Sequence, residues 1–159
     1  AFPILALSYG WIQSGHPDRD CWHLAQVVAF LKHFLAVEAG IGVKDVALFW
    51  DFYSLEQLPR DFTQNLRFRA ALQFMNTLYG HLDVQILRLN DLPPQTNPIC
   101  LRGWPFFEEA VFSAASKGSD NIFVCSNRSQ LLSAGEPSIS ESHRLLESLQ
   151  SARNVPMSP

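Results

Sequence analysis

The sequence predicts an α/β fold, a three-layer sandwich in which a mainly parallel sheet of about four to five strands has helices on both faces. Short apolar segments alternate along the chain with longer segments whose apolar residues recur at helical spacing. This alternation is typical of parallel sheets, and continuous apolar strands are typical of sheets covered on both faces. The chain has 159 residues, of which 47% are hydrophobic and 17% charged, so it is long enough to bury a core.

Four short segments have the composition of buried strands. They cover residues 4–9, 46–50, 84–89 and 121–125. Each is followed by polar, glycine-containing or proline-containing sequence, which favours a loop. Because ligands of open α/β sheets bind outside the carboxyl ends of the strands, we expect the functional residues in the loops that follow them.

A first helix is expected to begin near Asp18 or Asp20, either of which can cap it, and to end at Gly40. Its apolar residues recur at helical spacing and predict one buried stripe. The stripe consists of Leu24, Val27, Val28, Leu31 and Leu35.

Three further helices are expected. The segment 62–79 is apolar over a wide arc, so we expect it to be well covered. Pro105 occupies a favourable first position for a helix that Lys117 and Gly118 would end. A last helix is expected over 140–151. We therefore predict a single domain over residues 1–152, followed by a tail or linker over 153–159.

The composition argues against several classes of function. The net charge is −3, without the basic footprint of a nucleic-acid-binding domain, although Arg60, Arg67 and Arg69 lie close in sequence. No apolar run approaches the roughly 20 residues of a membrane span. Three cysteines without CxxC spacing argue against a disulfide framework and a zinc site, and His16, His23 and His33 are expected in loops or at the surface. We therefore expect no metal site, and because no leader opens the chain we expect a cytoplasmic protein.

Rings, an amide, an arginine and carboxylates follow the strands at the predicted ligand-binding edge. Such a mixture suits a ligand with a flat ring and hydroxyl groups, held by stacking and by hydrogen bonds to carboxylates. The candidate substrate-binding residues are Tyr9, Trp11, Asp51, Gln57, Arg102 and Trp104. Structural roles stay open for these residues, since Asp51 also suits a cap and the tryptophans also suit a core.

Glu108 is the candidate catalytic residue. If Phe107 points to the core, Glu108 lies about 100° around the helix, at the margin of the buried face, and Glu109 lies about 200° around it, toward solvent. The alternative is that both glutamates only stabilise the first turn through the helix dipole. No GxGxxG, P-loop or GxSxG motif occurs, which argues against dinucleotide dehydrogenases, P-loop NTPases and serine hydrolases.

The same segments resemble the fungal heterokaryon-incompatibility (HET) domain. Four blocks of that family have counterparts here in the same order. They are Ser8-Tyr9-Gly10-Trp11, Asp51 with Gln57, Met75-Asn76-Thr77-Leu78-Tyr79, and Arg102-Gly103-Trp104 with Glu108. Three residues depart from the family pattern, namely Ser54, Glu56 and Phe107. The chain is therefore similar to a divergent HET domain.

HET domains in turn resemble the TIR domain, which implies a flavodoxin-like, TIR-like fold. The block from Trp104 to Glu108 is similar to the TIR segment that carries the glutamate for NAD cleavage. The resemblance implies that Glu108 serves cleavage of NAD or NADP between nicotinamide and ribose, in cell-death or immune-type signalling. The dinucleotide would be the substrate, and no cofactor would be needed.

Two alternatives remain open at this point. The chain is also compatible with a non-catalytic assembly module that pairs with itself or with another TIR-like or HET-like domain, which the departures at Ser54 and Phe107 favour. A base-exchange or deoxyribosyl-transfer enzyme would use the same carboxylate, and only its products would distinguish it.

Overall fold

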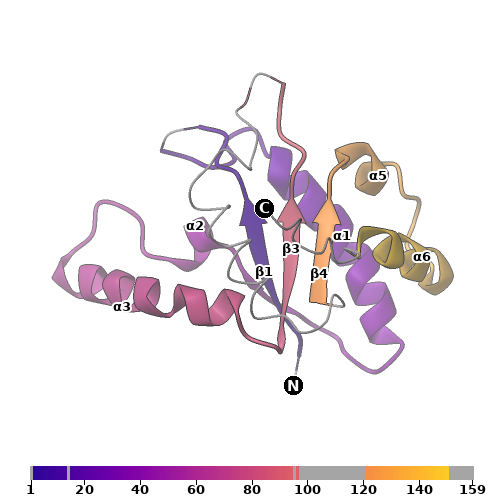
Figure 1. Cartoon of the computed structure of the whole chain (residues 1–159), viewed down its shortest axis with the longest axis horizontal. Coiled ribbons are helices and arrows are strands. Elements are labelled where there is room, and N and C mark those ends of the chain that lie inside the picture. Colours follow the sequence, from indigo (N-terminus) through magenta and orange to yellow (C-terminus); the bar gives the residue numbers. More distant parts are fainter. Residues whose placement is uncertain (1, 14, 95, 97–120, 151–159) are drawn as a thin grey trace, which may run out of the picture.

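The computed structural model describes residues 2–13, 15–94, 96 and 121–150, and it has the α/β architecture that the sequence predicts. Four strands form one sheet in the order β2-β1-β3-β4, and every neighbouring pair is parallel (Figure 1). The strands are β1 (Ile4–Tyr9), β2 (Ala47–Phe49), β3 (Val84–Leu89) and β4 (Ile122–Cys125). This is the strand order of a flavodoxin-like three-layer sandwich.

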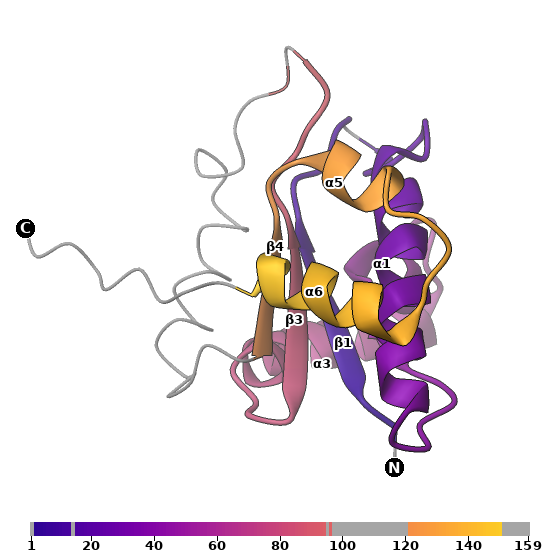
Figure 2. The same cartoon turned by 90° about the vertical axis from the view of Figure 1, so that its right-hand side faces the viewer.

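Helices cover both faces of the sheet. On one face lie α1 (Trp22–Ala39), α5 (Arg128–Leu132) and α6 (Ile139–Leu149), grouped on one side in Figure 2. On the other face lies α3 (Phe62–Tyr79), and the short α2 (Asp51–Ser54) follows β2 directly. The chain reverses its direction across the sheet after β2, so right-handed crossovers place α1 and α3 on opposite faces.

The sheet separates two cores of unequal size. The larger core joins alternate residues of β1, β3 and β4 to Phe30 and Phe34 of α1 and to Leu146 and Leu149 of α6. The smaller core contains Ala6, Val84 and Ile86 from the sheet, with Met75 and Tyr79 from α3. The Tyr79 hydroxyl donates to the carbonyl oxygen of Leu7 over 2.7 Å and ties the end of α3 to β1.

Side-chain caps explain where the two long helices begin. The carboxylate of the buried Asp18 accepts from the backbone amides of His23 (2.8 Å) and Leu24 (2.7 Å), so it caps α1 from outside the helix. Asp61 and Gln64 form a reciprocal capping box at the start of α3. The predicted start near Asp18 or Asp20 is therefore too early: α1 begins at Trp22 and its N-cap residue is Cys21, whose side chain makes no capping hydrogen bond, while Asp18 holds the first turn from outside the helix.

The predicted buried stripe of α1 is only partly correct, because Val27 is buried and Leu31 packs against the larger core, but the buried face is turned away from Leu24 and Val28. Leu24 and Val28 are 40% and 45% exposed, whereas the buried residues are His23, Gln26, Val27, Phe30, His33 and Phe34. The expectation that His23 and His33 lie in loops or at the surface is therefore also wrong. Both are buried because they can form hydrogen bonds, His23 with the Gly10 carbonyl and His33 with the Ser142 hydroxyl, each at 2.9 Å.

The prediction that the second long helix is well covered is wrong as well. In α3 only Met75 and Tyr79 are buried, and the N-terminal half of the helix projects beyond the sheet (Figure 1). Phe62, Leu66 and Phe74 are 79%, 52% and 67% exposed. The cause is geometric, because the short strand β2 and the neighbouring β1 offer the helix too little sheet surface along its length.

Other boundaries differ by a few residues. β2 is shorter than predicted, α6 covers 139–149 instead of 140–151, and α2 and α5 form where loops were expected. The predicted helix that begins at Pro105 and the tail over 153–159 lie outside the described residues. In the described part of the chain, no helix combines the length and the apolar character that crossing a bilayer requires.

Candidate functional site

A pocket of about 450 Å³ opens at the carboxyl end of β1 and β2, on the side of the sheet that carries α3. Its volume falls within the roughly 300–1,000 Å³ of typical small-molecule sites. The lining residues come from the end of β1, the loop after it, the segment 51–60 and one face of α3. They are Tyr9, Trp11, Asp51, Phe52, Leu55, Gln57, Arg60, Phe68, Leu72 and Met75.

Tyr9 and Asp51 form the polar centre of the pocket wall. Tyr9 ends β1 and Asp51 begins α2, and the Tyr9 hydroxyl donates to Asp51 Oδ1 over 2.5 Å. The backbone amide of Phe52 donates to the same oxygen over 2.6 Å. Among the described residues nothing donates to Asp51 Oδ2, so this oxygen remains able to accept from a ligand hydroxyl.

Aromatic rings supply the apolar part of the wall. Trp11 is 38% exposed and meets the ring of Phe52 edge to face, with 5.6 Å between the ring centroids. Behind them, Tyr9 packs edge to face against His23 and Trp50, at 5.1 and 5.7 Å. The buried rings hold Tyr9 in place, and the partly exposed Trp11 contributes an aromatic side chain to the pocket wall.

Gln57 shapes the loop that closes the pocket toward α3. Its side-chain nitrogen donates to the carbonyl oxygens of Phe52 (2.8 Å) and Leu55 (3.0 Å). The amide group thus stabilises the turn after α2, and its oxygen Oε1 accepts nothing from the residues that the structure describes. Gln57 is accordingly both a structural residue and a lining residue of the pocket.

Four of the seven residues singled out in the sequence therefore meet in one pocket, namely Tyr9, Trp11, Asp51 and Gln57. Arg102, Trp104 and Glu108 lie outside the described residues. The convergence of Glu108 with the other candidates therefore stays a prediction.

Arg60, Phe52 and Phe68 also line the pocket, although the sequence did not single them out for it. For Phe52, the position directly after Asp51 was an available signal. The segment 51–60 turns back toward α3, and no sequence pattern indicated that it would bring Arg60 to the same cavity.

No group of three or more histidine, cysteine, aspartate or glutamate side chains gathers at metal-binding distance within residues 2–13, 15–94, 96 and 121–150. Burial raises the pKa of the Cys125 thiol to about 11 and keeps it protonated near neutral pH. Cys125 lies in the larger core and takes no part in the pocket.

Comparisons of the chain with protein-family models, with curated proteins and with solved structures gave no match.

Proposed function

We propose that the pocket binds an NAD-like nucleotide and that the protein cleaves NAD or NADP at the nicotinamide–ribose bond, as a divergent HET-like, TIR-like domain in cytoplasmic signalling. The observation that carries the proposal is the Asp51 carboxylate, which has one oxygen anchored by Tyr9 and one available oxygen in a ring-lined pocket. An acceptor beside aromatic faces suits a ribose with its attached base. The position at the carboxyl ends of parallel strands is where such folds bind nucleotides.

The chemistry needs little from the protein beyond binding and charge. The bond between ribose C1′ and the pyridinium nitrogen breaks, and its electron pair neutralises the departing nicotinamide. Water then adds to C1′ and releases a proton to solvent. A carboxylate near C1′ stabilises the oxocarbenium-like transition state, and we assign this role to Glu108 from the family resemblance. Asp51 holds a ribose hydroxyl, and Trp11 stacks on a base.

The decisive experiment compares Glu108→Gln with Glu109→Gln in an NAD and NADP consumption assay on concentrated protein. Removing one group that stabilises the charge of a transition state costs roughly 10²–10³-fold in rate, so Glu108→Gln should lose about this much while Glu109→Gln keeps the wild-type rate. Free nicotinamide with ADP-ribose identifies hydrolysis, and an exchanged base identifies the transfer alternative. Equal rates in both variants, or no NAD loss at any protein concentration, would contradict the proposal.

A second function, assembly with a further copy of this chain, is favoured by an apolar row on α3. Phe62, Leu66, Ala70 and Phe74 recur every four residues and are all exposed. In an antiparallel pair of α3 helices, Phe62 of one copy faces Phe74 of the other and Leu66 faces Ala70, so large residues meet small ones at the centre.

This contact would be weak. Eighteen residues span roughly 27 Å of helix, and so narrow a surface buries less than the roughly 800 Å² per partner of a stable interface. Sedimentation over a range of concentrations should show a dimer that Leu66→Asp abolishes and that Ile41→Asp, at another exposed apolar position, leaves intact. A wild-type chain that stays monomeric at millimolar concentration would refute assembly through α3.

A further inference from the structure

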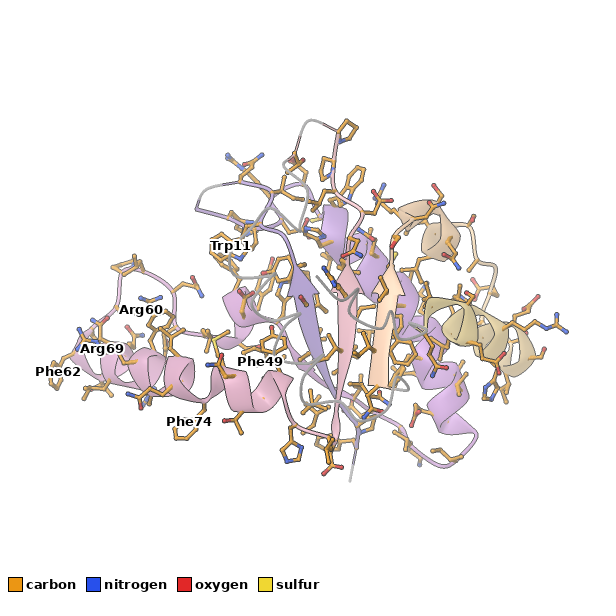
Figure 3. All side chains as sticks on the ribbon, in the orientation of Figure 1. Trp11, Phe49, Arg60, Phe62, Arg69 and Phe74 are labelled. Carbon is orange, nitrogen blue, oxygen red and sulfur yellow. The ribbon has the colours of Figure 1, made fainter. Side chains whose placement is uncertain are left out.

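Arg60 is the one cation among the described residues that line the pocket, and its side chain is held from two sides. Its Nε donates to the carbonyl oxygen of Glu56 over 2.5 Å. Its guanidinium carbon lies 3.5 Å from the centroid of the Phe68 ring, so the group stacks on that ring. Figure 3 shows Arg60 and Trp11 on the same side of α3, with Phe74 on the opposite side. The two contacts fix the plane of the guanidinium group.

The terminal nitrogens of Arg60 are left for another partner. Within the described part of the chain, Nη1 and Nη2 donate no hydrogen bond and no carboxylate pairs with the group. Arg67 in α3, by contrast, has a carboxylate partner, because its Nη1 lies 3.5 Å from the Glu56 carboxylate. Stacking and the Nε bond account for the position of Arg60, but they do not use the two-nitrogen edge that matches phosphate or carboxylate oxygens.

We propose that Arg60 is the phosphate-binding residue of this pocket. This assignment rests on the proposed function, because it takes the ligand to be a nucleotide. It adds that Arg60 binds the phosphate of that nucleotide. Asp51 and Arg60 line the same cavity without forming an ion pair with each other. The pocket thus offers separate partners for the hydroxyls and for the phosphate of one nucleotide unit, with the Trp11 ring beside them.

The test uses adenosine and AMP, which differ only in the phosphate and contain no nicotinamide–ribose bond to cleave. Calorimetry on the full chain gives the ratio of their affinities for wild type, Arg60→Met and the matched control Arg67→Met. A guanidinium–phosphate contact should make AMP bind at least about tenfold more tightly than adenosine, which corresponds to about 1.4 kcal/mol. Arg60→Met should reduce the ratio to about one, and Arg67→Met should keep it.

Arg60→Lys adds a control for folding and for charge alone, since it keeps the cation but not the planar fork. It should retain part of the preference for AMP. A ratio that Arg60→Met leaves unchanged would overturn the assignment, and so would a pocket that binds neither compound. Because neither compound can be hydrolysed by the proposed reaction, a preference for AMP that depends on Arg60 stands even if the NAD consumption assay fails.

Discussion

The Tyr9–Asp51 hydrogen bond joins the end of β1 to the start of α2, at the point where the pocket opens. Tyr9 is buried, so its hydroxyl needs the carboxylate oxygen as a partner, and the carboxylate is held in place in return. Asp51 therefore contributes to stability through Oδ1, and its Oδ2 is available to bind a ligand.

Separate substitutions should distinguish these two roles. Tyr9→Phe leaves the carboxylate in the pocket and should lower the free energy of unfolding by about 1–3 kcal/mol, with AMP affinity changed less than threefold. Asp51→Ala should lower AMP affinity about tenfold or more, because the hydroxyl acceptor is lost. Urea unfolding and calorimetry measure the two quantities. Equal AMP affinities of Asp51→Ala and wild type would show that the carboxylate is only structural.

Cys125 provides a pH-dependent test of the larger core. Burial raises the pKa of its thiol from 9.0 to about 11. Below pH 9 the thiol is protonated in both the folded and the unfolded chain, so its contribution to stability is fully present. Between pH 9 and 11 the unfolded chain loses this proton before the folded chain does, and the stability gained from the buried thiol is lost.

The free energy of unfolding of a Cys21→Ser/Cys100→Ser variant should therefore fall more steeply above pH 9 than that of the same variant with Cys125→Ala. In the first variant, thiol reagents at pH 8 should modify Cys125 only as fast as the chain unfolds. Rapid modification in the folded state would show that this thiol is accessible.

The gathering of Tyr9, Trp11, Asp51 and Gln57 was predictable because it depends on strand ends, and strand ends are visible as breaks in apolar sequence. Arg60 was not predictable in the same way. Its position depends on how the segment 51–60 turns and on the stacking with Phe68, which are tertiary contacts between residues of different elements.

At the scale of elements, α3 combines a buried and an exposed side on one helix. Met75 is 4% exposed and packs in the smaller core, whereas its neighbour Phe74 is 67% exposed. The bounds of this helix were predicted from the spacing of its apolar residues, whereas its capping box was found only in the structure. The spacing did not predict which of these apolar residues are buried. The apolar arc is wider than the sheet surface available to the helix, so tertiary packing decides which residues are covered.

Substitutions at two neighbouring residues of α3 should therefore change the free energy of unfolding by very different amounts. Met75→Ala leaves a cavity and should cost about 2–5 kcal/mol of stability. Phe74→Ala removes an exposed ring and should change the free energy of unfolding by less than about 0.5 kcal/mol. Denaturant unfolding of the two variants measures this difference. A large loss of stability in Phe74→Ala would mean that its ring is covered in solution.

The same reasoning explains the rotation of α1. Leucine and valine positions marked one stripe in the sequence, yet besides Val27 the buried side carries two phenylalanines, two histidines and a glutamine. The hydrogen bonds between His33 and Ser142 and between His23 and the Gly10 carbonyl satisfy the polar groups of this buried face. The periodicity of apolar residues could not predict these hydrogen-bond partners, because they belong to α6 and to the loop after β1.

At the scale of the whole molecule, the unequal cores predict unequal local stability. The α1 and α6 side holds Phe30, Phe34 and Phe123 in mutual ring contact, whereas the buried residues of α3 that pack on the sheet, Met75 and Tyr79, lie near its C-terminal end. Amide hydrogen exchange should accordingly be slowest in β1, β3 and the middle of α1, and at least about tenfold faster in residues 62–70. Uniform protection along α3 would contradict this description.

The alternation of strands and helices was sufficient to predict the parallel sheet and its helices on both faces. The pattern states the class of fold because parallel strands need covered crossovers. The alternation does not predict how much of each helix lies over the sheet, and this overlap determines how exposed α3 is.

Although Tyr9 and Met75 line the pocket and also belong to the two cores, other residues of the pocket wall do not, and this has a practical consequence for redesign of the protein. Trp11, Phe52, Phe68 and Leu72 form walls without belonging to either buried cluster. A library randomised at these four positions would be expected to yield mostly folded members, so the scaffold could be selected for unrelated small molecules.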